Sequence, residues 1–133
     1  MNRKAFAGGM GTSVSPLSRA LLVGRTLHVS GTLGVDADGR LADGIEAQTG
    51  QALANIRALV EEAGGQIEDV VSTRVYLARR EDFAAMNAVY AEIFAAPPPA
   101  RMTVTVTHIH PECLVEIEAV AVLADLDFSP AAP

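Results

Sequence analysis

Arg101 is the residue whose position most strongly suggests chemistry, because it follows three prolines in the stretch "PPPARMTVTV". The alternation of threonine and valine after it predicts a strand over residues 101–107. A cation at the start of such a strand has three interpretations: a surface charge, a structural ion pair, or a fixed anchor for an anionic ligand. Spacing alone leaves all three open.

Two carboxylates form the second candidate. Glu116 and Glu118 stand two residues apart in a predicted strand over residues 114–123. Both side chains therefore project from one face of the sheet, while Val115 and Ile117 take the other. Carboxylates on a sheet face need water, cations or a cleft around them. They are either part of a solvated face or a general acid–base group that orients water.

The histidines and the cysteine give weaker signals. His108 and His110 share a strand face, but no third ligand stands at a matching spacing, and we expect no metal. Cys113 lies outside any thiol motif and directly before an apolar run. This position favours a buried structural cysteine over a nucleophile.

Two further polar positions remain ambiguous. Ser30 and Gly31 end the segment "LHVSG", and a glycine there marks either a bulge or the close approach of a ligand to the backbone. Asn87 interrupts the apolar face of a predicted helix. It is either an ordinary helix-face amide or a contact to a ligand across a cleft.

Composition narrows the classes of function. The chain has 133 residues, of which 50% are hydrophobic and 20% charged, which predicts one globular domain over residues 1–133. The net charge of −6 and the scattered basic residues argue against nucleic acid as a partner. One cysteine fits a reducing compartment, and no segment approaches the ~20 apolar residues of a membrane span. We expect no membrane association and a cytoplasmic location.

The hydrophobic periodicity predicts the order β-β-α-β-α-β-β. Apolar residues recur at spacings of three and four over residues 44–63 and 81–94, which indicates two amphipathic helices. Residues 1–13 are expected to form a loose N-terminal arm. The result is an α+β fold, a two-layer sandwich with both helices on one face of a mixed sheet. Its other face would be bare, which predicts an oligomer.

Taken together, these segments resemble the reactive intermediate deaminase (Rid, or YjgF-like) family over about residues 14–124. The resemblance rests on dispersed motifs in the right order: "VSG" at 29–31, "EAQTGQALANIRALVEEAGG" at 46–65, "DVVSTRVYLARREDFAAMNAVYAEIF" at 69–94, "PAR" at 99–101 and "LVEIEAVA" at 114–121. It implies a chorismate-mutase-like fold and a homotrimeric barrel with a ligand cleft at each subunit boundary. It also implies hydrolysis of carboxylate-bearing imines and enamines, such as 2-aminoacrylate, to a keto acid and ammonia without a cofactor.

The resemblance assigns roles by position. Arg101 matches the arginine that binds the substrate carboxylate, and Glu116 matches the glutamate that orients the attacking water, with Glu118 as the second choice. The substrate-binding positions that it implies are Ser30, Gly31, Asn87, Leu17 and Thr103.

Two positions depart from the archetype of the family. Leu17 replaces an aromatic hydroxyl, and Thr103 stands where a cysteine is common. The sequence is therefore similar to a divergent member with an altered pocket.

Three classes of function stay open at this point. The first is an imine or enamine deaminase, with a pathway-specific deaminase of the aminomuconate type as its variant. The second is a non-catalytic module that binds keto acids or similar metabolites and reports them to a partner. The third is a ribonuclease, against which the acidic net charge argues.

Overall fold

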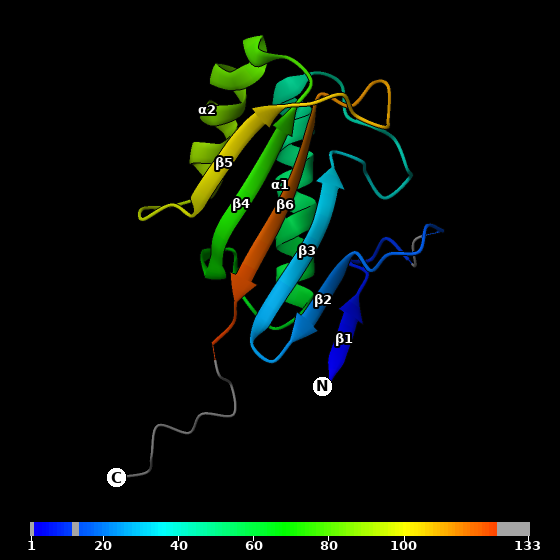
Figure 1. Ribbon diagram of the computed structural model, residues 1–133, viewed down its shortest axis with the longest axis vertical. Coiled ribbons are helices and arrows are strands. Elements are labelled where there is room, and N and C mark those ends of the chain that lie inside the picture. The colour runs from blue at the N-terminus through cyan, green and yellow to red at the C-terminus, as the bar shows by residue number, and fades with distance from the viewer. Residues whose placement is uncertain (1, 12–13, 125–133) are drawn as a thin grey trace.

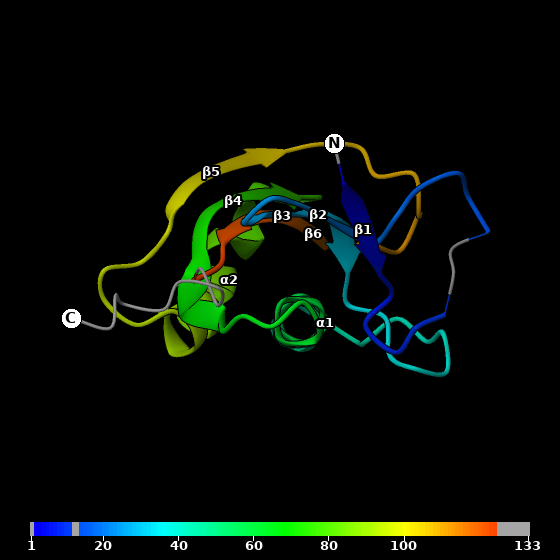
Figure 2. The same ribbon diagram turned by 90° about the horizontal axis from the view of Figure 1, so that it is seen from below.

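Six strands form one curved sheet, and two helices pack against one of its faces (Figures 1 and 2). This architecture comes from a computed structural model, which describes residues 2–11 and 14–124. The elements in chain order are β1 Arg3–Phe6, β2 Ala20–Val23, β3 Thr26–Leu33, α1 Ile45–Glu62, β4 Val70–Leu77, α2 Phe83–Ile93, β5 Ala100–Thr105 and β6 Val115–Val122. The strand order is β1-β2-β3-β6-β4-β5, and β4 and β5 are the parallel pair in an otherwise antiparallel sheet. The predicted α+β sandwich is confirmed.

The core lies between the sheet and the helices. Helix α1 ends at Glu62, and Gly64 follows with a φ of 98°, a left-handed conformation that glycine adopts without a steric penalty. The buried face of α1 is mostly apolar, as its periodicity predicted, and also includes the polar residues Gln48 and Thr49. Its apolar members are Ile45, Ala52, Leu53, Ile56, Leu59 and Val60. Strand β6 is the central strand, and its residues alternate regularly between buried and partly exposed. This alternation confirms that Glu116 and Glu118 share a face.

The N-terminal arm is where the prediction was wrong. Residues 3–6 form an edge strand that pairs with β2, from Arg3 opposite Val23 to Phe6 opposite Ala20. Phe6 is buried, and the ammonium of Lys4 lies 5.2 Å from the centre of its ring. Four residues with two charges show no periodicity, so their pairing could not be read from the sequence. The rest of the predicted arm includes residues 1 and 12–13, which lie outside the described residues.

The face of the sheet opposite the helices is open in the chain (Figure 2). Exposed apolar side chains of β5 and β6 lie on it, among them Met102, Val104 and Val122. None of the helices in the described part of the chain is both long and apolar enough to cross a membrane.

Candidate functional site

The predicted site residues fall into two groups, and Arg101 of the first lies on the opposite face of the sheet from Glu116 of the second. The arginine cluster consists of Asn87, Arg101 and Thr103, which come from α2 and β5. The glutamate cluster consists of Leu17, Ser30, Gly31 and Glu116, which come from the segment before β2 and from β3 and β6.

Arg101 extends over an aromatic platform formed by α2. Its guanidinium carbon lies 4.7 Å from the centre of the Tyr90 ring and 5.8 Å from that of Phe83. One guanidinium nitrogen, Nη1, lies 3.9 Å from the sulfur of Met86. Among the described residues, no carboxylate lies within ion-pairing distance of Arg101. The contacts with the rings hold the cation in place, and its Nε and Nη2 atoms, which have no hydrogen-bond partner among the described residues, are available to an anion.

A hydrogen bond to β4 fixes the ring of Tyr90. Its hydroxyl shares a buried 2.7 Å hydrogen bond with the hydroxyl of Thr73, the residue paired with Arg101 across β4 and β5. Burial raises the pKa of Tyr90, so its hydroxyl stays protonated at neutral pH. The platform under the guanidinium is therefore rigid and uncharged.

Two unpaired polar atoms accompany the arginine. Thr103 follows Arg101 by two residues and so faces the same side of β5. Its Oγ1 atom is buried without a hydrogen-bond partner, and so is Oδ1 of Asn87 on α2. By helical spacing Asn87 shares the face of Phe83 and Tyr90. Buried polar atoms are nearly always paired, but neither oxygen has a donor among the described residues, so both are available to accept a hydrogen bond.

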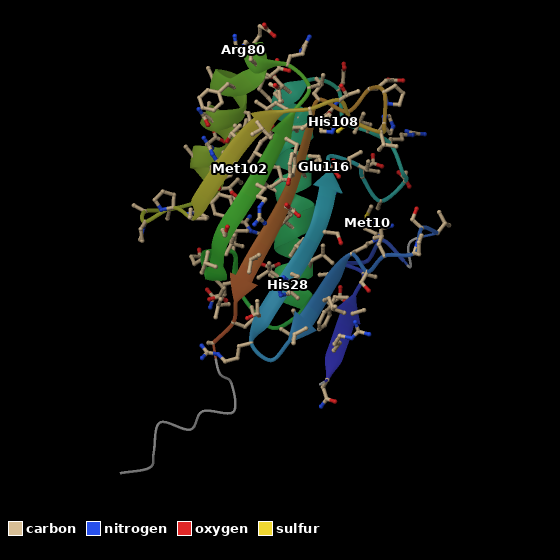
Figure 3. All side chains as sticks on the ribbon, viewed as in Figure 1. Met10, His28, Arg80, Met102, His108 and Glu116 are labelled. Atoms are coloured by element: carbon tan, nitrogen blue, oxygen red, sulfur yellow. The ribbon has the colours of Figure 1, made fainter. Side chains whose placement is uncertain are left out.

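Glu116 lies on the open face, at the end of the sheet near the loop that precedes β6 (Figure 3). Its Oε1 atom is 3.5 Å from Nδ1 of His108. Its Oε2 atom lies directly against Gly31, where the Cβ of any other residue would collide with it. Gly31 sits in a register shift of β3 between Val29 and Thr32. Only a glycine allows Glu116 to approach the backbone this closely, and this contact lies within the bulge.

Glu118 is engaged elsewhere. Its Oε1 atom accepts a 2.7 Å hydrogen bond from the hydroxyl of Tyr76 and lies 3.5 Å from Nη1 of Arg74. The hydrogen bond to Glu118 raises the pKa of Tyr76, and burial and the negative charge of Glu118 add to this. Glu118 is thus held in a polar network of β4 and β6. Glu116 remains the better candidate for a water-orienting carboxylate.

Leu17, Ser30 and Gly31 line a cavity of about 320 Å³ beside β3. The Ser30 hydroxyl donates a 2.6 Å hydrogen bond to the carbonyl of Ser18, which leaves its oxygen free only as an acceptor. Leu17 is 52% exposed and supplies an apolar wall. The size of this cavity is within the range of small-molecule sites.

Within one chain the two clusters do not meet. Arg101 pairs with Thr73, which faces the helices, whereas Glu116 pairs with Tyr76, three residues further along β4. An odd separation along a strand reverses the face, so the sheet stands between the guanidinium and the carboxylate. Strands β3 and β5 are also three strand spacings apart, roughly 14 Å.

The histidines and the cysteine have identifiable surroundings. His110 is exposed, and its Nδ1 atom accepts a hydrogen bond from the backbone N–H of Glu112. Within residues 2–11 and 14–124, no group of three or more His, Cys, Asp or Glu is placed to hold a metal ion. Cys113 is buried, and burial together with the nearby charge of Glu116 raises the pKa of its thiol to about 11. It therefore stays a thiol at neutral pH, as expected of a structural cysteine.

Sequence reasoning missed the neighbours that define both clusters. The platform residues Phe83 and Tyr90 recur at helical spacing with Asn87, a pattern that is also typical of core residues, and Phe83 is 45% exposed. His108 was considered only as a metal ligand. Its contact with Glu116 could not be predicted, because β5 and β6 are separated by β4 in the sheet and do not pair. The loop that joins them therefore does not show which residues lie opposite each other.

The family model described as Endoribonuclease L-PSP matches residues 11–123. A RutC family protein of Pyrococcus abyssi is 41% identical over 110 residues, 81% of this chain and 87% of the relative. A 2-iminobutanoate/2-iminopropanoate deaminase of Capra hircus is 40% identical over 116 residues, 86% of this chain and 85% of the relative.

A solved structure agrees with the fold as well. The crystal structure of RidA from an Antarctic Psychrobacter species superposes with a TM-score of 0.84 at 36% identity, covering 90% of this chain and 98% of the other. The chain belongs to the L-PSP endoribonuclease family, which is the Rid or YjgF-like family that its motifs predicted.

Proposed function

We propose that this protein hydrolyses imines and enamines that carry a carboxylate, releasing a keto acid and ammonia. The observation that carries the proposal is the guanidinium of Arg101, held over Tyr90 without an acidic partner among the described residues. A guanidinium group without an acidic partner can bind a carboxylate through two parallel hydrogen bonds. The names of relatives such as the Capra hircus deaminase support the same reaction.

The chemistry needs little beyond positioning. Arg101 holds the carboxylate and Glu116 orients a water molecule toward the iminium carbon. As the C–O bond forms, one water proton passes to Glu116, which then returns it to the nitrogen. The C–N bond breaks with its electron pair leaving on ammonia, and the hydroxyl loses its proton as the carbonyl forms. Water is the co-reactant, and no step needs an oxidant or a reductant.

The proposed site is formed between two copies of the chain in a homotrimer. The arginine cluster of one copy would face the glutamate cluster of its neighbour, since the sheet separates the two within a copy. The unpaired oxygens of Asn87 and Thr103 and the apolar residues of the open face support such a contact. Leu17 would then form an apolar wall around the carbon chain of the substrate.

The test compares ammonia release by the wild type, Arg101→Ala and Arg101→Lys from imines of several amino acids generated enzymatically. Arg101→Ala should lower kcat/KM about a hundredfold or more. Arg101→Lys should restore only part of kcat/KM, because an ammonium group cannot bind a carboxylate bidentately. Release equal to the rate without enzyme for every imine would overturn the proposal. Saturable keto-acid binding that Arg101→Ala abolishes would then identify a metabolite-binding protein instead.

RNA is the less favoured substrate, although the matching family model is described as an endoribonuclease. A net charge of −6 works against neutralising phosphates.

A further inference from the structure

His108 is a buried histidine to which the proposed reaction assigns no task. It lies in the loop after β5, and its side chain is 4% exposed. Figure 3 labels it at the same end of the sheet as Glu116. Its Nδ1 atom is 3.5 Å from Oε1 of the glutamate. This separation is long for a direct hydrogen bond, but contacts of this kind tighten when a substrate is bound.

The two oxygens of Glu116 face different neighbours. Oε1 faces the imidazole, whereas Oε2 lies against the backbone at Gly31, on the rim of the cavity. A partner on Oε1 fixes the rotation of the carboxylate and leaves Oε2 to accept a hydrogen bond from water. The imidazole is therefore placed to set the direction in which the glutamate acts.

Other polar groups around Glu116 are already engaged. The hydroxyl of Tyr76 donates to Glu118, which also pairs with Arg74. The thiol of Cys113 donates to the carbonyl of Val115. Of the titratable groups that the structure describes near the carboxylate, His108 is the one left to donate to Oε1.

The second ring nitrogen indicates which tautomer His108 adopts. Nε2 is buried and has no hydrogen-bond partner among the described residues. A hydrogen on Nε2 would be a buried donor without an acceptor, whereas a hydrogen on Nδ1 points at a carboxylate. The Nδ1–H form satisfies the donor and leaves only a lone pair unpaired.

We propose that His108 is a positioning residue for Glu116: its Nδ1–H group holds Oε1 so that Oε2 orients the attacking water. This inference rests on the proposed function for the identity of the reaction. It goes beyond that function because neither the reaction nor the resemblance assigns a role to this side chain.

The kinetic test uses three substitutions and one control. Asparagine places an amide N–H close to the position of Nδ1, glutamine places it close to Nε2, and phenylalanine fills the buried site without a donor. His108→Phe should lower kcat about tenfold to a hundredfold with KM within about twofold of the wild type. His108→Asn should recover most of kcat, and His108→Gln should recover less. The exposed His110→Gln should behave like the wild type.

The outcome that overturns the inference is equally specific. If His108→Phe retains the kcat of the wild type, or if His108→Gln recovers kcat better than His108→Asn, the imidazole does not act through Nδ1. A raised KM with an unchanged kcat would also contradict the inference, since a positioned carboxylate acts in the transition state. Circular dichroism spectra identify any variant that fails to fold.

A second readout does not depend on catalysis. Long-range proton–nitrogen correlation spectra of the wild type should show the Nδ1–H tautomer for His108, and Glu116→Ala should remove that preference. An Nε2–H tautomer in the wild type would overturn the inference. If no imine is hydrolysed but the Nδ1–H tautomer depends on Glu116, the proposed reaction fails while the positioning contact stands.

Discussion

Single atoms distinguish the candidate residues from their neighbours of the same type. Glu118 is a carboxylate like Glu116, but a tyrosine hydroxyl occupies the oxygen that would otherwise be free. His110 is a histidine like His108, but it is exposed and caps a turn. Residue type therefore decides less than the partners of each polar atom.

The surroundings of Cys113 likewise determine how its thiol titrates. Burial and the charge of Glu116 raise the pKa of its thiol to about 11, above the ordinary value of 9.0. The unfolded chain therefore releases the thiol proton at a lower pH than the folded chain does. The stability that the neutral thiol contributes should be fully present below about pH 9 and be lost as the pH rises toward 11.

This loss of stability can be measured by comparing the wild type with Cys113→Ala. Urea unfolding of the wild type and Cys113→Ala at pH 8 and pH 10.5 cancels the titration of all other groups. The wild type should lose more free energy of unfolding between the two pH values than the variant does. Equal losses would contradict the raised pKa, as would rapid labelling of the native thiol by a disulfide reagent at pH 8.

At the scale of the elements, the bulge in β3 is the feature that shapes the glutamate cluster. The register shift between Val29 and Thr32 brings Gly31 against Glu116. In Gly31→Ala the added methyl group must displace Oε2, so kcat should fall about tenfold or more while the fold is kept. Ammonia release and circular dichroism measure the two effects.

Gly50→Ala is the matched control for this substitution. Gly50 lies inside α1, and a Cβ there would meet only Val89, at 3.9 Å. The same added methyl group should leave kcat unchanged and stabilise the protein by about 0.5–1 kcal/mol, because alanine favours helix over glycine. If Gly31→Ala also leaves kcat unchanged, then Glu116 does not act from this position.

The elements also show how far the sequence could be interpreted. Periodicity predicted both helices and the alternation of β6, because apolar side chains must meet one core. It could not predict β1, whose stability comes from pairing with β2 and from burying Phe6. Alternation along β4 would put Val71 on the same side as Val75, which is buried, but a register shift between Val70 and Ser72 leaves Val71 exposed.

Site residues were predictable only one at a time. The resemblance indicated Arg101 and Glu116, yet nothing in their spacing shows that they face opposite sides of the sheet. That result depends on β4, which pairs with both strands, and on the odd offset between Thr73 and Tyr76. Long-range pairing of this kind is set by the whole fold rather than by local pattern.

At the scale of the whole molecule, an incomplete site and an uncovered sheet point to the same assembly. Among the described residues Arg101 has no acidic partner and the oxygens of Asn87 and Thr103 have no donor, and the open face carries apolar side chains. A neighbouring copy whose open face meets the edge of the sheet at β5 would address all three. Assembly and activity should therefore be lost together.

Val104→Lys tests this coupling. Val104 lies on the open face of β5, next to Met102 and away from the guanidinium of Arg101. A lysine there would bury a charge on assembly, which costs several kcal/mol. Sedimentation should show the wild type at about three times the 13.9 kDa mass of the chain and the variant as a smaller species with little ammonia release. Ala54→Lys, on the exposed face of α1, is the control and should alter neither property. A wild type that sediments as a stable monomer at micromolar concentration, or a monomeric variant with full activity, would show that one chain contains the complete site.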